Sequence, residues 1–199
     1  MNKKQLSISL SKLKPLKNFK VQLEQYQTEG ELASEIIWKA YQDGNIEKKS
    51  VTDLGCGSGI LGVGALLLNA KKAYFVDIDE EAIKICKENV KEYKNSECLN
   101  ILISSFNKEV DTVLMNPPFG VQNRKADKEF LLKAFEISKN IYSIHKIESK
   151  SFIEKISQEN GFVVKEIIER DFRINKIYKF HKKQKYEVKI GVWHIEKNR

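Results

Sequence analysis

Asn116, Pro117, Pro118 and Phe119 follow the apolar run 111–115, which is typical of a buried parallel strand. Ligands bind just outside the carboxyl ends of such strands. Each proline fixes φ and lacks an N–H, and the residue before a proline is kept out of the helical region. The Asn116 amide and a neighbouring carbonyl are therefore held in a nearly fixed relation beside a flat ring. Two acceptors and an aromatic face suit a planar –NH2 group on an aromatic ring, although the same tetrapeptide could be only a rigid surface turn.

Three glycines alternate in a loop between an apolar strand expected at 50–54 and an apolar helix expected at 59–69. Glycines permit a tight turn and a close approach to a ligand, and the helix N-terminus offers N–H groups. The Gly-x-Gly-x-Gly spacing differs from the Gly-x-Gly-x-x-Gly of a dinucleotide-binding loop. We expect the loop to hold a cofactor through Asp53, Gly55, Gly57, Ser58, Gly59 and Ile60.

A second strand, expected at 73–77, ends in Asp77 about twenty residues beyond the glycines. An acid in that position accepts hydrogen bonds from both hydroxyls of a ribose. Asp77 could instead start the next helix, but Asp79 is the better N-cap, which leaves Asp77 for a ligand. We therefore expect Asp77 and Ile78 to belong to the cofactor site.

The chain of 199 residues is long enough for one α/β domain with a full core. We expect a single domain over 1–199, with a helical segment at 1–45 packed on it. The sequence has no run of eighteen apolar residues and no apolar signal segment, so no membrane partner is expected. The three cysteines lack metal-binding spacing, which predicts no metal site and suits the reducing cytoplasm.

The net charge of +8 is unevenly distributed along the chain. Residues 31–119, which hold the expected cofactor loop, carry ten Lys and Arg against fourteen Asp and Glu. Residues 1–30 carry six against two, and residues 120–199 carry nineteen against eleven. Positive charge on both sides of an acidic cofactor half predicts a polyanionic substrate.

The remaining elements follow from the apolar periodicity. A basic helix is expected within 1–20, stopping near Pro15, and a second helix at 31–41 with Thr28 as its cap. Further helices are expected at 80–93, 127–139 and 149–158, and further strands at 100–103, 111–115, 141–144, 162–169 and 186–195. This alternation predicts a doubly wound, mostly parallel α/β sheet, with the last two strands as an antiparallel pair at one edge.

Two basic stretches are candidates for substrate binding. The run 176–185 interleaves lysines with aromatic rings, as a phosphate clamp with a stacking platform would, or as a solvated connection between two strands would. The residues just past Phe119 could form a lid over a base or an ordinary polar loop. The candidates are Arg124, Lys125, Tyr178, Phe180, His181, Lys182 and Lys183.

These features resemble the small archaeal and eukaryotic methyltransferases that N6-methylate one adenosine of small-subunit ribosomal RNA. The tetrapeptide at 116–119 is similar to the (Asn/Asp)-Pro-Pro-(Tyr/Phe/Trp) motif of amino-group methyltransferases, and the glycine loop is similar to their motif I. The resemblance covers nearly the whole chain and rests on residues 23–28, 53–57, 77–79, 111–120, 142–146 and 178–183.

The resemblance implies a seven-stranded, Rossmann-like class I methyltransferase fold with an N-terminal helical extension, and S-adenosylmethionine as cofactor. It places Gln25, Tyr26 and Thr28 over the cofactor and Asp53 near its methionine part. Eukaryotic members need a small zinc-containing activator subunit, so a comparable partner is implied here. One departure concerns the strand after residue 100, which usually ends in an acid near the cofactor's adenine. This chain reads Ile103-Ser104-Ser105-Phe106 there. A serine could still accept from the adenine amino group, and we expect Ser105 and Phe106 to line that site.

The sequence therefore predicts a cytoplasmic enzyme that transfers a methyl group to N6 of an adenosine in RNA, with small-subunit rRNA as the expected substrate. Two alternatives stay open. Related Asn-Pro-Pro-Tyr enzymes methylate a glutamine amide in a translation factor, which is equally planar. The fold could also serve a non-catalytic RNA-binding protein. The basic C-terminal region favours RNA, and the intact motifs favour an enzyme.

Overall fold

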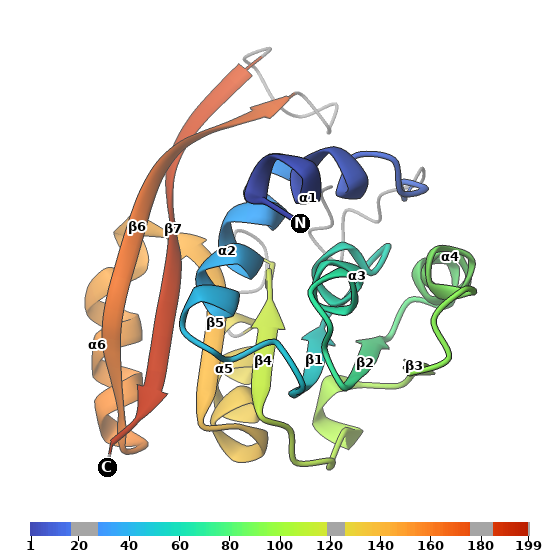
Figure 1. Cartoon of the computed structure of the whole chain (residues 1–199). Helices are drawn as coiled ribbons and strands as arrows, with labels where there is room; N and C mark the ends of the chain where they lie inside the picture. The colour runs from blue at the N-terminus through green and yellow to red at the C-terminus, as the bar shows by residue number, and fades with distance from the viewer. Residues whose placement is uncertain (17–27, 119–125, 176–184, 199) are drawn as a thin grey trace.

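The computed structural model describes residues 1–16, 28–118, 126–175 and 185–198, and their centre is a seven-stranded sheet (Figure 1). The strand order is β3-β2-β1-β4-β5-β7-β6. β1 to β5 are parallel, whereas β7 is antiparallel to both β5 and β6. The predicted sheet and its antiparallel edge pair are confirmed. The strands are β1 Ser50–Leu54, β2 Lys72–Asp77, β3 Ser96–Asn100, β4 Thr112–Met115, β5 Asn140–Lys146, β6 Phe162–Asn175 and β7 Lys185–Lys197.

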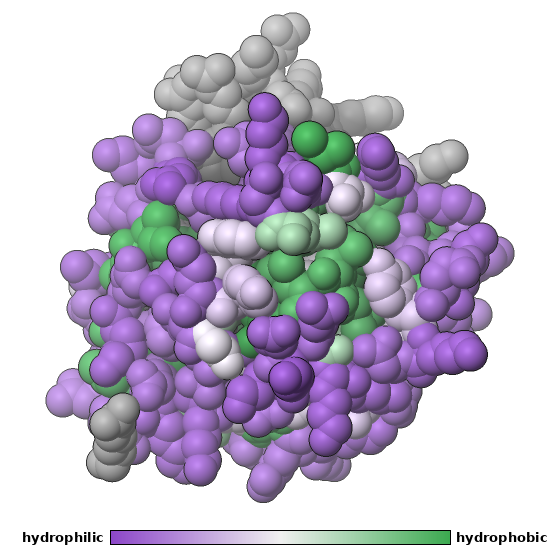
Figure 2. Space-filling view, in the orientation of Figure 1, coloured by the Kyte–Doolittle hydropathy of each residue, from purple (hydrophilic) through white to green (hydrophobic). Residues whose placement is uncertain are grey.

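Helices cover both faces of the sheet, as the doubly wound prediction requires. On one face, α1 to α4 share a core with side chains such as Phe75 of β2 and Leu114 of β4. On the other face, α5 and α6 pack on residues such as Val113 and Trp193. The helices are α1 Lys3–Leu10, α2 Gly30–Gln42, α3 Ile60–Leu67, α4 Glu80–Val90, α5 Ala126–Ile137 and α6 Lys150–Glu159. Figure 2 shows the first face as hydrophilic around its rim, with a hydrophobic area in its middle near α3.

Three predicted boundaries are wrong for identifiable reasons. The third strand ends at Asn100 rather than beginning there, because the Asn100 amide donates to the carbonyls of Asp77 and Ile78 and a 3-10 turn follows at Ile103–Ser105. The first helix ends at Leu10, well before Pro15. The second helix has Glu29 rather than Thr28 at its N-cap.

The last two strands are longer than predicted and extend past the sheet. β5 and β7 pair only as far as Lys146 opposite Ile190. β6 and β7 continue to pair with each other through five further residue pairs, ending at Asn175 opposite Lys185. Because Lys146 is the carboxyl end of β5, this two-stranded arm projects beyond the carboxyl edge of the parallel strands, as Figure 1 shows. No helix among the described residues is long and apolar enough to cross a membrane.

Candidate active site

The candidate site lies at the carboxyl ends of three adjacent strands, β2, β1 and β4. In this part of the sheet Leu54 stands opposite both Val76 and Met115, so the three strands end at the same level. Asp77 is the residue after Val76, and Asn116 is the residue after Met115. The shared register therefore brings the acid and the amide to one edge of the sheet, on either side of the glycine loop that follows β1.

The glycine loop needs its glycines for backbone reasons. Gly55, Gly57 and Gly59 have φ values of +72°, +54° and +86°, where an L side chain is strained. A Cβ on Gly59 would lie 2.6 Å from the Cys86 sulfur, whereas a Cβ on Gly57 would meet no described atom within 4 Å. The loop is thus packed down at Gly59 and faces open space at Gly57. Ser58 is partly exposed beside it, and the Ile60 side chain is buried.

Asp53 holds the start of α3. Gly59 at the N-cap has no side chain to offer, and the Asp53 Oδ2 atom instead accepts a hydrogen bond from the Gly62 N–H at 2.8 Å. The Asp53 side chain is buried, and burial raises the pKa of its carboxyl to about 8, while the Gly62 N–H opposes that change. Asp53 therefore fixes the position of the first turn of α3 relative to β1. Its position in the motif did not reveal this role.

Asp77 braces the loop from the neighbouring strand. Its Oδ2 accepts from the Gly57 N–H at 2.8 Å and its Oδ1 accepts from the Asp79 N–H at 2.9 Å. Asp79 in turn caps α4 by accepting from the Glu81 N–H, so the predicted cap is confirmed. Burial raises the pKa of the Asp77 carboxyl, against the effect of these N–H groups. Ile78 beside it is half exposed, which leaves this side of the site open to a ligand.

Asn116 is held by the N-terminal segment. Its Nδ2 donates to the Thr28 Oγ1 at 2.8 Å, and Thr28 is buried. Pro117 is buried and Pro118 partly so. The contact explains why Thr28 does not cap α2, and sequence reasoning missed it because 88 residues separate the two side chains.

The other predicted site residues differ in how far the structure places them. Ser105 is exposed in the 3-10 turn, whereas the Phe106 ring is buried against the Tyr74 ring of β2. Phe106 therefore packs beneath the turn that carries Ser105. No cluster with the geometry of a metal site occurs among the described residues. The remaining predictions lie outside the described residues: Gln25, Tyr26, Phe119, Arg124, Lys125, Tyr178, Phe180, His181, Lys182 and Lys183.

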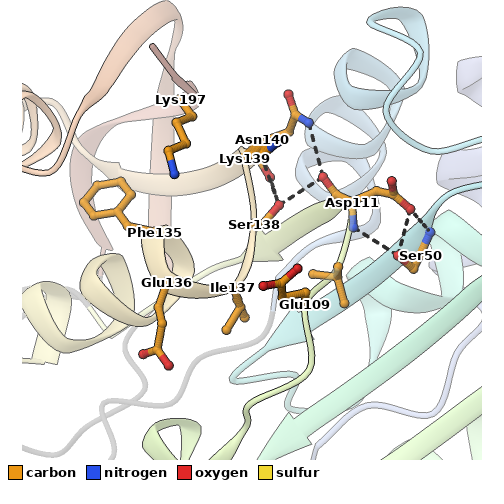
Figure 3. A pocket seen from close by; sticks show the side chains of 11 residues that line it. Ser50, Glu109, Asp111, Phe135, Glu136, Ile137, Ser138, Lys139, Asn140 and Lys197 are labelled. Atoms are coloured by element: carbon orange, nitrogen blue, oxygen red, sulfur yellow. Dashed lines mark hydrogen bonds between the residues drawn. The ribbon is translucent and has the colours of Figure 1, made fainter. Parts of the chain in front are cut away.

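A cavity of about 420 Å³ lies at the opposite, amino edge of the sheet (Figure 3). Its walls include Ser50 at the start of β1 and Asn140 at the start of β5. The polar groups there bond to one another: Asp111 accepts from Ser50 through its carboxylate, and from Ser138 and Asn140 through its carbonyl. This cavity lies where β1 and β5 begin, at the edge of the sheet opposite to the candidate site, and is separate from that site.

Comparisons with known proteins agree with this fold and indicate a family. Residues 33–117 match the family described as ribosomal protein L11 methyltransferase (PrmA), a span that holds the glycine loop and Asp77 and ends at Pro117. The chain is 33% identical to the rRNA N(6)-adenosine-methyltransferase METTL5 of Danio rerio, over 96% of each chain. It is 35% identical to Mettl5 of Drosophila melanogaster, over 89% of this chain and 88% of that one. The crystal structure of a proposed RNA methyltransferase from Pyrococcus horikoshii superposes with a TM-score of 0.94, at 48% identity over 100% of this chain and 99% of that one.

The buried Asp53 carboxyl makes stability depend on pH. Because its pKa is raised from 3.8 to about 8, the folded protein keeps a proton that the unfolded chain loses in this range. The free energy of unfolding should fall as pH rises from about 4 to about 8, by at most about 1.4 kcal/mol per pH unit. Urea unfolding at several pH values, compared with Asp53→Asn, isolates this group. A wild-type minus variant difference that stays flat with pH would show that the Gly62 N–H keeps Asp53 ionised.

Proposed function

The chain belongs to the METTL5 family of rRNA N6-adenosine methyltransferases, and we propose that its Asn116-Pro117-Pro118 corner holds an adenosine of small-subunit rRNA for methylation at N6. The protein is an RNA adenine-N6 methyltransferase, and its cofactor is S-adenosylmethionine. The observation that carries the proposed role of the corner is the Asn116–Thr28 hydrogen bond at the carboxyl end of β4, across the glycine loop from Asp77.

The described residues fit the cofactor. The loop faces open space at Gly57, where a Cβ would meet no described atom within 4 Å, so the backbone can approach a ligand there. Asp77 stands beside that space, and its carboxylate oxygens can accept from ribose hydroxyls in addition to the two N–H groups that they already bind. When bound, S-adenosylmethionine supplies a methyl group on a sulfonium, already activated for transfer.

The corner acts on the acceptor nitrogen. The lone pair of adenine N6 is delocalised into the ring, which makes it a poor nucleophile. An Asn116 Oδ1 that accepts an N6–H bond, together with a backbone carbonyl of the corner, returns lone-pair density to the nitrogen. The Thr28 hydroxyl accepts a hydrogen bond from the Asn116 Nδ2, and this contact orients the Oδ1 atom toward the acceptor nitrogen in our proposal. A neutral amine needs no side-chain base to attack a sulfonium, so alignment at about 3–3.5 Å provides most of the remaining acceleration.

RNA is supported as the polyanionic partner by the charge of the chain. The match to the L11 methyltransferase family ends at Pro117, and the segment beyond it holds the projecting β6–β7 arm and most of the excess positive charge. A glutamine amide in a protein would need the same acceptors but would give no reason for this charge.

We also propose a cytoplasmic location and a small activator subunit as partner. The three cysteines are free thiols, which suits a reducing compartment. Among the described strands, the edge strand β3 pairs only with β2, and Leu102 just beyond it is 54% exposed. An unpaired strand edge beside an exposed apolar side chain is a suitable attachment site for such a subunit.

Replacing Asn116 by Ala should abolish methyl transfer, because the acceptor nitrogen then loses its amide partner. Binding of S-adenosylmethionine should survive, since Asn116 contacts the acceptor and not the donor. Transfer of labelled methyl groups to purified small-subunit rRNA, followed by nucleoside analysis, measures the first; calorimetry measures the second. Label found in a release-factor protein and not in the RNA would overturn the substrate. Loss of cofactor affinity in a folded Asn116→Ala protein would overturn the role of the residue.

Thr28→Val should lower kcat about tenfold without changing cofactor affinity, because the isosteric side chain removes the hydroxyl that accepts from Nδ2 of the partly buried Asn116. Thr28→Ser keeps the hydroxyl and should restore most of the rate. Single-turnover kinetics with saturating RNA, beside calorimetric cofactor titration, distinguish the two variants. If Val weakens the cofactor and leaves kcat unchanged, Thr28 acts on the donor instead.

A further inference from the structure

The first helix carries positive charge that its own stability does not explain. Residues 1–16 contain four lysines and no acidic residue. Lys3 and Lys4 occupy the first turn of α1, where the helix dipole disfavours cations and favours acids. A neutral capping box satisfies the N–H groups of Asn2 and Gln5 at this end of the helix. The lysines therefore oppose the helix on which they stand, and their benefit must come from elsewhere.

The helix is nevertheless fixed firmly to the domain. Leu6 and Leu10 are fully or almost fully buried in the core shared with α2 and α3. At Gly30 the backbones of α1 and α2 approach so closely that a Cβ would lie 2.8 Å from the Ser7 carbonyl oxygen. Lys4 and Lys12, two turns apart along the helix and its C-terminal extension, are exposed. Anchored leucines thus present exposed lysines on a rigid support.

Arg170 of β6, the strand at the far edge of the sheet, adds a further cation to this surface. The Lys3 Nζ and the Arg170 guanidinium both bind the same oxygen of Glu35, which is almost buried on α2. The side chains of Lys3 and Arg170 remain 45% and 51% exposed. One carboxylate therefore holds two half-exposed cations side by side, with one positive charge in excess. Such a fixed pair suits a single phosphate group better than two mobile side chains would.

This surface lies at the catalytic end of the molecule. Gly30, against which α1 packs, is two residues from Thr28, the partner of Asn116. The chain after α1 is also tied to the cofactor loop, because Asn89 bonds both to the Lys14 backbone and to the Ser58 carbonyl. Figure 1 shows α1 across the end toward which β1 and β4 point, with the β6–β7 arm rising beyond it. The sequence 171–189, which includes the end of β6 and the start of β7, contains seven Lys and Arg against two acids.

We propose that α1, through Lys4 and Lys12, and the Lys3–Glu35–Arg170 cluster form a docking surface for the phosphate backbone of the substrate RNA, separate from the corner that receives the base. The inference rests on the proposed RNA substrate. A folded RNA offers rows of phosphates that match cations fixed on a helix and on a strand, whereas a single small anion would need only one of them. The surface therefore supplies affinity and orientation, and the corner supplies chemistry.

The test compares two double variants with the same change in charge. Lys4→Gln with Lys12→Gln removes two exposed cations of the proposed surface that are in none of the described ion pairs. Lys139→Gln with Lys197→Gln removes two exposed cations at the cavity on the opposite edge. Affinity for a small-subunit rRNA fragment is measured by fluorescence anisotropy at several salt concentrations, with cofactor affinity as a check on folding.

The first pair should weaken RNA binding about tenfold at low salt and reduce the slope of log affinity against log salt by about 1.4–1.8, the value for two phosphates. The second pair should follow the wild type. Parallel lines for all three proteins would overturn the docking surface. An equal loss of binding to an acidic polypeptide would show a general polyanion site and overturn the assignment to RNA.

A methyl-transfer assay distinguishes a failure of the docking surface from a failure of the proposed function. If wild type and the Lys4/Lys12 variant methylate RNA equally at limiting RNA concentration, the surface is wrong and the proposed function stands. If the wild type binds RNA through these lysines but methylates no adenosine in it, the proposed function is wrong and the surface stands. A lower kcat/KM with an unchanged kcat in the variant supports both.

Discussion

The common level at which β2, β1 and β4 end is the constraint on which the site depends. Leu54 stands opposite Val76 on one side and Met115 on the other, so the next residues of each strand emerge together. Neighbouring strands lie about 4.8 Å apart, which puts the backbones of β2 and β4 about 10 Å apart, with the glycine loop between them. A shift of either neighbour by one residue would turn Asp77 or Asn116 to the other face of the sheet. The buried core on both faces prevents such a shift.

The N-terminal segment completes the site from above. Its described contacts with the domain include Leu6 and Leu10 in the core, the ion pairs Lys3–Glu35 and Lys14–Glu88, the Lys14 backbone on Asn89, and Thr28 on Asn116. Asn89 also holds the Ser58 carbonyl, so the same side chain touches the segment and the cofactor loop. The N-terminal segment, which begins with the lysine-bearing helix, therefore contacts the glycine loop through Lys14 and Asn89 and the acceptor corner through Thr28. In our proposal, this arrangement gives the methyltransferase domain itself an RNA-facing surface.

The sequence predicted the parts of this structure that local physics determines. Gly55, Gly57 and Gly59 adopt the positive φ values that only glycine tolerates easily, and Asp79 caps α4 as its spacing required. What could not be predicted depends on tertiary contacts. The sequence predicts Thr28 as a helix cap, but its side chain bonds to Asn116. The sequence also predicts a strand in the apolar residues after Asn100, but the strand ends at Asn100. The arm of β6 and β7 extends past the last residue pair between β5 and β7, so its length depends on pairing between these two strands alone among the described ones. Outside the described residues, the predicted roles of Phe119 and the 176–185 run stay predictions.

The central claim is that Asp77 and Asn116 hold the two reactants on either side of the glycine loop. A crystal structure of the protein with S-adenosylhomocysteine and a short adenosine-containing RNA tests it most directly. The account predicts that the Asp77 carboxylate accepts from the ribose hydroxyls of the cofactor product. It also predicts that adenine N6 lies within hydrogen-bond distance of the Asn116 Oδ1, on the side facing the sulfur. A base bound elsewhere, or an Asn116 amide turned so that Nδ2 faces N6 and Oδ1 faces Thr28, would contradict it.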